Sequence, residues 1–545
     1  MSATALAVIN HSSTKPTLNE TFQSLANSAL LGARGNSGMI FSQFFSGLTE
    51  TSLSSDQLDT TAFAELITKA SKSVRSAILH PVEGTILTVI DAWSASMTKL
   101  SKELSCFKQL IKHTLTEVHQ ALQSTTDLLL VLKDAQVVDA GALGFYHFIT
   151  GFSEYLINPH LINKQDASHP CAIAHHESFE HTKRPHHRYC TEITLAGESL
   201  HRDALAHLLE PYGDSIVSSG NASLCRFHIH CTDPAELFES FSTKGQITHS
   251  KADDMLRQFE MIHQQKYPIA LVTDSSADLP KTLLDEFQIH QIPLNMHLDG
   301  HHLLDRLCVN QEKFYDRLAT LTPYPKTSFP SPALIETQLT QLSRHYEHVL
   351  VLPIAQALSG THDAIVKASE GLKNVHTMNT CLTSAGLGLL IAHAADRIAN
   401  HDPIESIKHA LTLKIPKINF FVYVANFDAL IRCGRVKKLS GLIAQFAHIK
   451  PIISLDPLGQ GILTGKTFSE TKAFHKLIHH VKTLSQKSPL EAYGLVHAGA
   501  PKQVMQFAAL TEEAFGMAPA FIESTSTAIG LHAGKGSVAI ASMLR

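Results

Sequence analysis

The stretch LVTDSSADLP, from Leu271 to Pro280, passes from apolar residues to hydroxyls and acids and then to a helix start. The apolar run Ile269 to Val272 predicts a short buried strand, and Asp278 with Pro280 in the first turn predicts a capped helix N-terminus. The loop Thr273 to Ser276 then lies where a strand ends and helix amides point outward, a place where α/β proteins hold anions. On periodicity alone, an ordinary strand-to-helix turn is the commoner explanation.

Further apolar runs follow this loop and alternate with helical stretches. They lie at Val349 to Leu352, Phe420 to Val424, Ile449 to Leu455, Tyr493 to His497 and Ala520 to Ile522. Strands that alternate with helices are typical of βαβ units, so this half of the chain predicts a parallel sheet.

The chain as a whole has 545 residues, too many for one core, so about two to four domains are expected. A net charge of −4 provides no positive field for nucleic acid or an anionic membrane, which argues against a nucleic-acid partner. The longest apolar runs, such as Ala385 to Ala395, are shorter than the ~20 residues of a membrane helix, and the N-terminus does not resemble a signal peptide. We therefore expect a cytoplasmic protein that is not transmembrane and makes at most transient contact with a membrane surface. The eight cysteines are scattered, so reduced thiols are expected.

The N-terminal part begins with a capping box, Thr17 to Glu20, ahead of an amphipathic helix. That helix leads into the loop Gly32 to Gly38, after which a second apolar helix is predicted from Met39. Three glycines at a helix start let backbone amides approach a ligand, and the helix dipole favours a phosphate there. Taken alone, such a loop is more often a simple helix junction.

Two further loops, His80 to Thr85 and Val137 to Ala142, also join helical stretches. No convincing strand pattern occurs up to about residue 155, so this part is predicted to be all-helical. Three polar loops that contain glycine could converge at one end of a helical bundle. The alternative is three unrelated turns.

A polar stretch from residue 156 to 188 is predicted to be a linker. After it, Tyr189 to Ile193 predicts a strand, Arg202 to Leu209 a helix, and Leu224 to His230 a second strand. His228 and His230 share one face of that strand, and a thiol on a neighbouring strand would complete a zinc-type donor set. Two paired surface histidines are the alternative. Cys231 is predicted to face the opposite side, and Gly245 to Gln258 is predicted to be a helix.

The LVTDSSADLP segment resembles the opening of the DegV family, bacterial proteins that hold a fatty acid between two α/β lobes. Five more segments resemble family motifs in the same order: Lys326 to Pro332, Leu358 to Thr361, Arg432 to Arg435, Ile449 to Leu455 and Ile529 to Gly534. Two positions depart from the family pattern, since Phe329 stands where glutamine is usual and Cys433 replaces a glycine. Six ordered motifs are specific where one would not be.

This resemblance implies a set of lipid-binding residues and two residues near the carboxylate head group. The lipid-binding residues would be Asp274, Ser275, Thr327, Ser328, Ser359, Gly360 and Thr361. Arg435 and His532 would lie near the head group and act as the catalytic residues. For the hydroxyl residues, helix capping and turn formation are the alternative roles.

The three N-terminal loops resemble those of the DhaL-like domain, the ATP-binding helical barrel of dihydroxyacetone kinases. The resemblance is closer to FakA-type fatty acid kinases, whose FakB partners are DegV proteins. It implies that ATP is contacted by Arg34, Asn36, Ser37, Gly38, Thr85, Asp139 and Gly141. The segment after the linker resembles the FakA middle domain, which implies a structural zinc on Cys190, His228 and His230 with a fourth ligand that cannot be named.

In these kinases, an Asp-Gly-Asp-Thr-Gly-Thr-Asn segment holds the catalytic magnesium just before the part that matches Met1 to Thr4. The sequence begins after that segment. Because phosphoryl transfer depends on this metal, we expect ATP and magnesium to act only if the segment is supplied upstream. Otherwise Glu83 or Asp139 would have to take over the metal.

The expected organisation is therefore multidomain: an all-α DhaL-like helical barrel (1–155), the linker (156–188), a small α/β middle domain (189–265) and a two-lobed α/β DegV fold (266–545). The first hypothesis is ATP-dependent phosphorylation of a bound fatty acid to an acyl phosphate, with an acyltransferase as the partner that accepts it. The second is a lipid carrier with a degenerate kinase domain, and the third is a glycerone-type kinase. A homodimer through the kinase-like domain is also expected.

Overall fold

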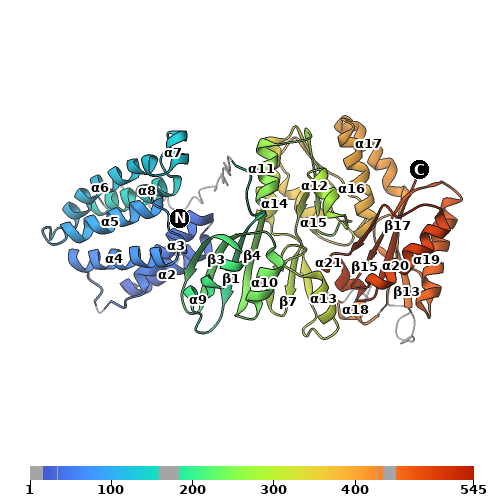
Figure 1. Ribbon diagram of the computed structural model, residues 1–545, viewed down its shortest axis with the longest axis horizontal. Helices are drawn as coiled ribbons and strands as arrows, with labels where there is room; N and C mark the ends of the chain where they lie inside the picture. The colour runs from blue at the N-terminus through green and yellow to red at the C-terminus, as the bar shows by residue number, and fades with distance from the viewer. Residues whose placement is uncertain (1–15, 34, 54, 159–182, 426, 434–449) are drawn as a thin grey trace. The chain divides into compact units, whose positions relative to one another are not determined.

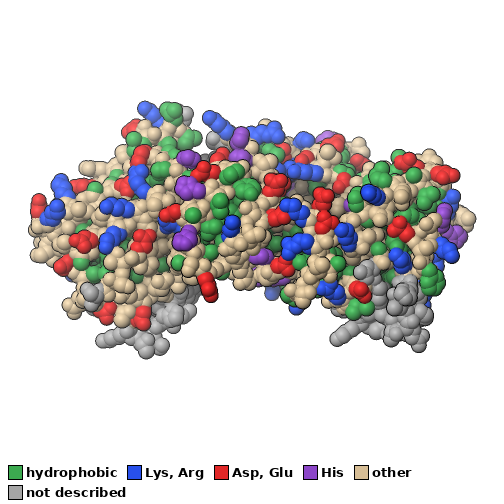
Figure 2. Space-filling view, turned by 60° about the horizontal axis from the view of Figure 1, so that its bottom comes forward, with side chains coloured by type: hydrophobic (Ala, Val, Ile, Leu, Met, Phe, Trp, Pro, Cys, Tyr) green, Lys and Arg blue, Asp and Glu red, His purple; other side chains and the backbone are tan. Residues whose placement is uncertain are grey.

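A computed structural model describes residues 16–33, 35–53, 55–158, 183–425, 427–433 and 450–545 (Figure 1). Two compact units are present. Of the described residues, the first unit comprises those from 16 to 158, His187–Thr232 and Lys244–Lys251, and the second comprises those from 183 to 186, Asp233–Thr243 and those from 252 to 545. No helix among the described residues is both long and apolar enough to cross a membrane. On the face drawn in Figure 2, acidic and basic side chains are interspersed, which fits a net charge of −4.

The N-terminal part of the first unit is all-helical, as predicted. Its helices are α2 (Leu18–Gly32), α3 (Gly35–Thr49), α4 (Thr60–Ser76), α5 (Ile86–Leu100), α6 (Phe107–Leu128), α7 (Leu130–Ala135) and α8 (Ala140–Ile157). The capping box before α2 is confirmed, because Glu20 N donates to Thr17 Oγ1 and Thr17 N donates to Glu20 Oε2. One expectation is wrong: α3 begins at Gly35 rather than Met39, so the end of the glycine loop forms the first helical turn.

The core of these helices is built from large aromatic side chains. Trp93, Phe44 and Phe145 are almost fully buried, and their ring centroids lie 5.3 to 5.9 Å apart. Aromatic rings at these distances bury much area and fix one packing arrangement. This core joins α3, α5 and α8, the helices that follow the three predicted loops.

The first unit also contains a four-stranded sheet in the order β2-β3-β1-β4. The strands are β1 (Tyr189–Ala196), β2 (Gly213–Gly220), β3 (Leu224–Cys231) and β4 (Gln246–Asp254), with α9 (Arg202–His207) and the 3₁₀ turn η3 (Glu210–Tyr212) after β1. Helix α3 contacts β2 through polar groups, since Ser42 Oγ lies 2.8 Å from Ser219 Oγ and Gly220 N donates to Gln43 Oε1 at 3.0 Å.

The predicted helix from Gly245 to Gln258 is wrong over most of its length. Gln246–Asp254 form β4, and only the last four residues of the range belong to a helix, α11 (Met255–His263). Strand β4 is an edge strand with few buried side chains, so its sequence QITHSKADD lacks the apolar alternation that would reveal it.

The second unit contains three sheets. A parallel sheet has the order β11-β10-β5-β6, a larger sheet has the order β14-β13-β12-β17-β15-β16, and a small antiparallel sheet has the order β8-β7-β9. The strands are β5 (Ile269–Asp274), β6 (His290–Ile292), β7 (Asn295–Leu298), β8 (His301–Leu304), β9 (Lys326–Ser328), β10 (His348–Val351), β11 (Val375–Thr377), β12 (Ile418–Tyr423), β13 (Lys450–Leu455), β14 (Gly461–Thr467), β15 (Leu490–His497), β16 (Phe521–Ser524) and β17 (Val538–Leu544).

The second unit also contains helices. They are α10 (Pro234–Ser242), α11, α12 (Lys281–Glu286), α13 (Gln311–Arg317), α14 (Pro332–His345), α15 (Thr361–Ala368), α16 (Ser384–Ala399), α17 (Ile404–Lys414), α18 (Phe427–Arg432), α19 (Glu470–Ser485), α20 (Pro501–Phe515) and α21 (Thr527–Ala533), with the 3₁₀ turn η4 (Ile415–Lys417) after α17. Helix α16 contacts both β5 of the parallel sheet and β12, β15 and β17 of the larger sheet. It therefore joins the two α/β lobes.

The prediction of a parallel sheet is confirmed for the lobe around β5 and β10 and is wrong for the other lobe. There, β12 pairs antiparallel with β13 and β17, and only β15 and β16 are parallel. The sequence interpretation missed β14 and β17. Strand β17 lies between β12 and β15 and pairs antiparallel with both, so β12 and β15 run in the same direction without pairing with each other.

Candidate functional site

The starts of α3, α5 and α8 lie together in the first unit. A Cβ atom on Gly141 would lie 2.5 Å from Ser37 Oγ and 3.1 Å from Asp139 Oδ2, so the first turns of α3 and α8 are in contact. Asp139 caps α8 by accepting from Ala142 N at 2.7 Å, and it also accepts from the backbone of Ile86 at the start of α5. The predicted convergence of the three loops is therefore confirmed.

This convergence concentrates backbone N–H groups and positive helix-dipole ends in one place. Asn36, Ser37 and Gly38 belong to the first turn of α3, and Thr85 is the N-cap of α5. Burial raises the pKa of Asp139. Arg34 lies outside the described residues. Such an arrangement suits an anion with several oxygens, such as a phosphate chain.

Glu83, one of the two acids considered as an alternative metal ligand, binds other side chains. Its carboxylate is 2.5 Å from Arg75 Nη2 and accepts from Thr88 Oγ1 at 2.8 Å. The bond from Arg75 holds the pKa of Glu83 below its usual range. Asp91 binds the same arginine, so Glu83 is part of a surface network beside α5.

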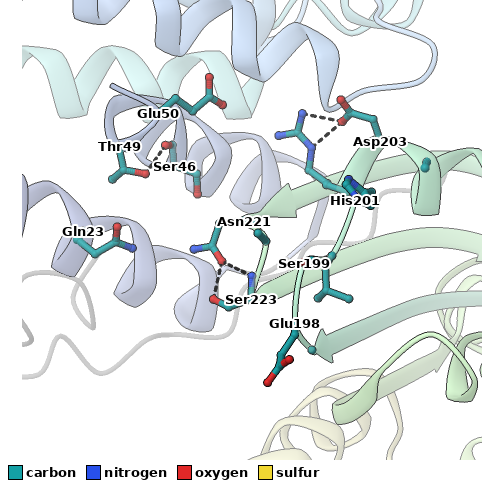
Figure 3. Close-up of a pocket in the computed structure, with 16 residues that line it drawn as sticks. Gln23, Ser46, Thr49, Glu50, Glu198, Ser199, His201, Asp203, Asn221 and Ser223 are labelled. Carbon is teal, nitrogen blue, oxygen red and sulfur yellow. Dashed lines mark hydrogen bonds and ion pairs between the residues drawn. The ribbon is translucent and has the colours of Figure 1, made fainter. Parts of the chain in front are cut away.

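A cavity of about 1020 Å³ opens at the other end of α3 (Figure 3). Ser46, Thr49 and Glu50 line it from the helix, and the sheet contributes two turns, Gly197 to Ala204 and Gly220 to Ser223. A helix of this length places its two ends roughly 20 Å apart. The cavity is therefore separate from the convergent loops.

The three predicted metal ligands lie next to one another on one face of the sheet. Cys190 stands opposite His230 in the β1–β3 ladder, and the ligand atoms of Cys190, His228 and His230 all lie within 4.8 Å of one another. His228 Nε2 is buried and has no hydrogen-bond partner among the described residues. A thiolate with two imidazoles is a donor set that zinc prefers, so these residues fit the metal.

Asp214 lies beside this cluster, and Cys231 does not belong to it. Asp214 Oδ1 lies 3.8 Å from His230 Nδ1, so this exposed acid is a candidate for the fourth ligand. Cys231 lies on the opposite face, as predicted, with its Sγ 3.2 Å from Thr191 Oγ1.

Sequence reasoning missed Glu192 and Arg226, a buried ion pair beside the cluster. Burial alone would raise the pKa of Glu192. The hydrogen bond from His228 and the positive charges of Lys251 and Arg226 outweigh burial and hold this pKa far below its usual value. The available signal was one acid in β1 (YCTEITLA) and one arginine in β3 (LCRFHIHC), two strands that are predicted to be buried, because a buried charge needs a partner.

In the second unit, Asp274 and Ser275 are fully buried at the carboxyl end of β5. Asp274 accepts from Ile354 N at 2.7 Å and from Ser276 N at 2.9 Å, and Ser275 Oγ donates to Asp305 Oδ2 at 2.6 Å. Burial raises the pKa of Asp274. These two side chains thus hold the loop after β10 and the segment around Asp305.

The turn that starts α15 lies beside the segment after β9. Ser359 Oγ is 2.8 Å from Thr361 Oγ1 and also accepts from Thr361 N, and a Cβ on Gly360 would lie 3.3 Å from the Phe329 ring. Thr327 is half-buried and pairs with Met296, while Ser328 is exposed. The structure therefore brings Ser359 to Thr361 and the Thr327 segment into one neighbourhood.

Asp278 does not cap a helix, and that prediction is wrong. Helix α12 has no side-chain cap, and Asp278 is buried, where it accepts from Arg306, Ser384 Oγ (2.5 Å), Thr525 Oγ1 (2.6 Å) and Ser526 N (2.9 Å). Sequence reasoning missed this network, although the run Ser524 to Thr527 marks it with four consecutive hydroxyl residues.

His532 lies in α21, whose start is fixed by the same network. Thr527 Oγ1 donates to Asp305 Oδ1 at 2.5 Å, and Tyr324 OH donates to Leu531 O at 2.6 Å. Arg432 lies over the Tyr324 ring at 4.4 Å from its centroid. Arg435, the other predicted head-group residue, lies outside the described residues.

Comparison with protein families gives three matches along the chain. Residues 268–545 match the model described as uncharacterised protein, DegV family. Residues 1–154 match the DAK2 domain, and residues 186–262 match the middle domain of FakA-like fatty acid kinase proteins.

Among curated proteins, the DegV domain-containing protein spr1415 of Streptococcus pneumoniae is 27% identical over 277 residues, which is 50% of this chain and 97% of that protein. The uncharacterized protein SH1689 of Staphylococcus haemolyticus is 27% identical over 259 residues, but the match spans only 47% of its length and 46% of this chain.

Two solved structures are also similar. The fatty acid binding DegV family protein SAG1342 of Streptococcus agalactiae is 28% identical with a TM-score of 0.47, and the match covers 51% of this chain and 99% of that one. A DegV family protein from Thermus thermophilus, described by its fatty acid binding, is 22% identical with a TM-score of 0.48 and the same coverage. Because the DegV family model matches more than half of the residues, this chain belongs to the DegV family.

Proposed function

We propose that the DegV part binds one long-chain fatty acid and that the helical part phosphorylates its carboxylate with ATP. The observation that carries the proposal is the pairing, in one chain, of a DegV domain with the convergent starts of α3, α5 and α8 in a DAK2 domain. Fusion of donor and acceptor domains raises the effective concentration of one around the other.

The head group would be held where Ser359 to Thr361 meets the segment around Thr327. A carboxylate needs hydrogen-bond donors, and Ser359, Thr327 and the backbone near Gly360 supply that chemistry. Asp274 and Ser275 contribute by fixing the loops, since both side chains are buried and bonded to protein atoms.

Nucleotide phosphates would lie at the convergent helix starts. Amides of Asn36, Ser37 and Gly38 would donate to them, and Gly141 leaves room because a larger residue would collide with Ser37. The Cys190, His228 and His230 cluster would hold a structural zinc ion that stabilises the sheet beside α3.

The lipid part is tested by mass spectrometry of the denatured protein and by uptake of added oleate or palmitate. Ser359→Ala should weaken retention about tenfold or more, because a hydrogen bond to a charged group contributes roughly 1.5–3 kcal/mol. Ser469→Ala is the matched control, since Ser469 is a half-buried serine at a helix start outside the proposed head-group site, where it caps α19 by accepting from Lys472 N. Absence of lipid together with absence of uptake would refute lipid binding.

The kinase part is tested by trapping acyl phosphate with hydroxylamine after ATP and fatty acid are added to the full chain. We expect ATP-dependent hydroxamate formation from protein that carries the Asp-Gly-Asp-Thr-Gly-Thr-Asn segment ahead of Met1, because that segment would hold the magnesium ion that phosphoryl transfer needs. Lipid uptake without any hydroxamate would instead favour the alternative, a lipid carrier whose DAK2 domain serves for docking.

A further inference from the structure

Glu192 and Arg226 form a buried ion pair that contacts two helix ends. Arg226 Nη1 donates to Leu30 O at 2.9 Å and lies 3.5 Å from Leu31 O, in the last turn of α2. Glu192 Oε1 accepts from Gly35 N, the first residue of α3, at 3.4 Å. The positive end of the pair thus faces the C-terminus of α2 and the negative end faces the N-terminus of α3, as both helix dipoles favour.

The same carboxylate borders the metal cluster. Glu192 Oε1 lies 3.8 Å from His228 Nδ1, and the two residues stand opposite each other in the β1–β3 ladder. Both members of the pair are buried, with side-chain exposures of 0% for Glu192 and 2% for Arg226. Groups behind a metal ligand commonly fix the orientation of its ring. Glu192 therefore lies between a metal ligand and the start of the helix that would bind phosphate.

We infer that Glu192 is a positioning residue that links the Cys190–His228–His230 cluster to the first turn of α3, so that metal binding strengthens nucleotide binding. The inference rests on the proposed function, which places a zinc ion and a nucleotide at these two places. A bound metal ion fixes the His228 ring, the ring restricts the Glu192 carboxylate, and the carboxylate with Arg226 holds Gly35. The amides that follow Gly35 are then oriented before the nucleotide arrives.

The test measures the affinity of the full chain for a fluorescent ATP analogue, with zinc bound and after removal of zinc by a chelator. In the native sequence, removal of zinc should weaken binding about tenfold. In Glu192→Gln, binding should be weak in both states, so the ratio of the two affinities falls towards one, while elemental analysis still finds zinc. Glu198→Gln, an exposed glutamate next to the cavity of Figure 3, should keep the native ratio.

The variant Glu192→Gln leaves Arg226 without its counter-charge, so the double variant Glu192→Gln with Arg226→Met is measured beside it. Replacement of both partners of a buried pair is often tolerated where removal of one is not. The double variant should also lose the effect of zinc on affinity. The inference would be overturned if either variant kept the native ratio of affinities with and without zinc. It would also be overturned if the affinity of the native chain did not change when zinc is removed.

Hydrogen exchange of the amides from Gly35 to Gly38 separates this inference from the proposed function. Removal of zinc should speed their exchange in the native chain and leave it unchanged in Glu192→Gln. If the analogue does not bind at all, the nucleotide proposal fails, and the exchange data alone decide whether Glu192 makes the link. Equal zinc dependence in both chains would refute it.

Discussion

Asp278 and Glu192 are fully buried carboxylates, and each is bound by an arginine, Arg306 for Asp278 and Arg226 for Glu192. Both connect elements far apart in the sequence, since Asp278 binds Thr525 and Glu192 binds Gly35. The sequence alone predicted the loop Thr273 to Ser276 and the grouping of the cysteine and histidine ligands, because each has a recognisable local pattern. Local patterns could not reveal which buried acid meets which arginine, because that depends on tertiary contacts.

A buried histidine predicts a pH dependence for the second unit. Burial lowers the pKa of His290 to about 3, from an ordinary value of 6.5, and the positive charge of Arg257 adds to the effect. Between pH 6.5 and 3 the unfolded chain binds a proton that the folded chain does not, so stability is lost as the pH falls through this range. From pH 7 to 5 this site should cost about 2 kcal/mol of unfolding free energy.

Urea unfolding of the second unit at pH 7 and pH 5 measures this loss. In His290→Gln, the new side chain can still bond to Tyr346, and the loss of unfolding free energy between pH 7 and pH 5 should be about 2 kcal/mol smaller than in the native chain. His475 is exposed, so His475→Gln serves as the control and should lose as much unfolding free energy as the native chain. An unchanged pH dependence in His290→Gln would refute the assignment.

At the level of elements, the sequence predicted the long helices and many of the apolar strands, but it missed the polar edge strand β4 and the central strand β17. The convergent loops were recognisable because each combines glycine, a polar residue and the start of a long helix. Strand β4 was missed because its sequence QITHSKADD carries polar residues on both faces. The antiparallel pairs of the larger sheet could not be inferred without β17, which pairs with both β12 and β15. Pairing partners are set by contacts that local patterns do not encode.

Variants of two aspartates that cap helices at the same hydrogen-bond distance can separate an effect on stability from an effect on nucleotide binding. Asp139 accepts from Ala142 N at 2.7 Å, and Asp59 accepts from Ala62 N at 2.7 Å at the start of α4. Asp139→Ala and Asp59→Ala should each destabilise the first unit by about 1 kcal/mol. Only Asp139→Ala should also weaken binding of an ATP analogue, because Asp139 contacts the starts of α5 and α8. Calorimetry gives both quantities, and equal affinities in the two variants would contradict the assigned place of the nucleotide.

At the scale of the whole molecule, two compact units predict two separable unfolding transitions. Ligands stabilise only the unit that binds them. Added oleate should raise the melting temperature of the DegV unit alone, and zinc should raise that of the first unit alone.

Cys190→Ser tests this independence. It should remove about one zinc ion per chain, lower the first transition and leave fatty acid retention unchanged. Elemental analysis, differential scanning calorimetry and lipid mass spectrometry give the three readouts. A chain that contains no metal when purified without chelator would refute the zinc site, and a shift of both transitions would refute independence.

Strand β17 has a consequence for the order in which the DegV part can assemble. It pairs with β12 on one side and β15 on the other, yet it follows both in the chain. While a ribosome is still making β17, the apolar edge of β12 has no strand to pair with on that side, and an open edge of this kind invites pairing with other chains. Newly made protein should therefore depend on chaperones until Val538–Leu544 emerges and closes the sheet.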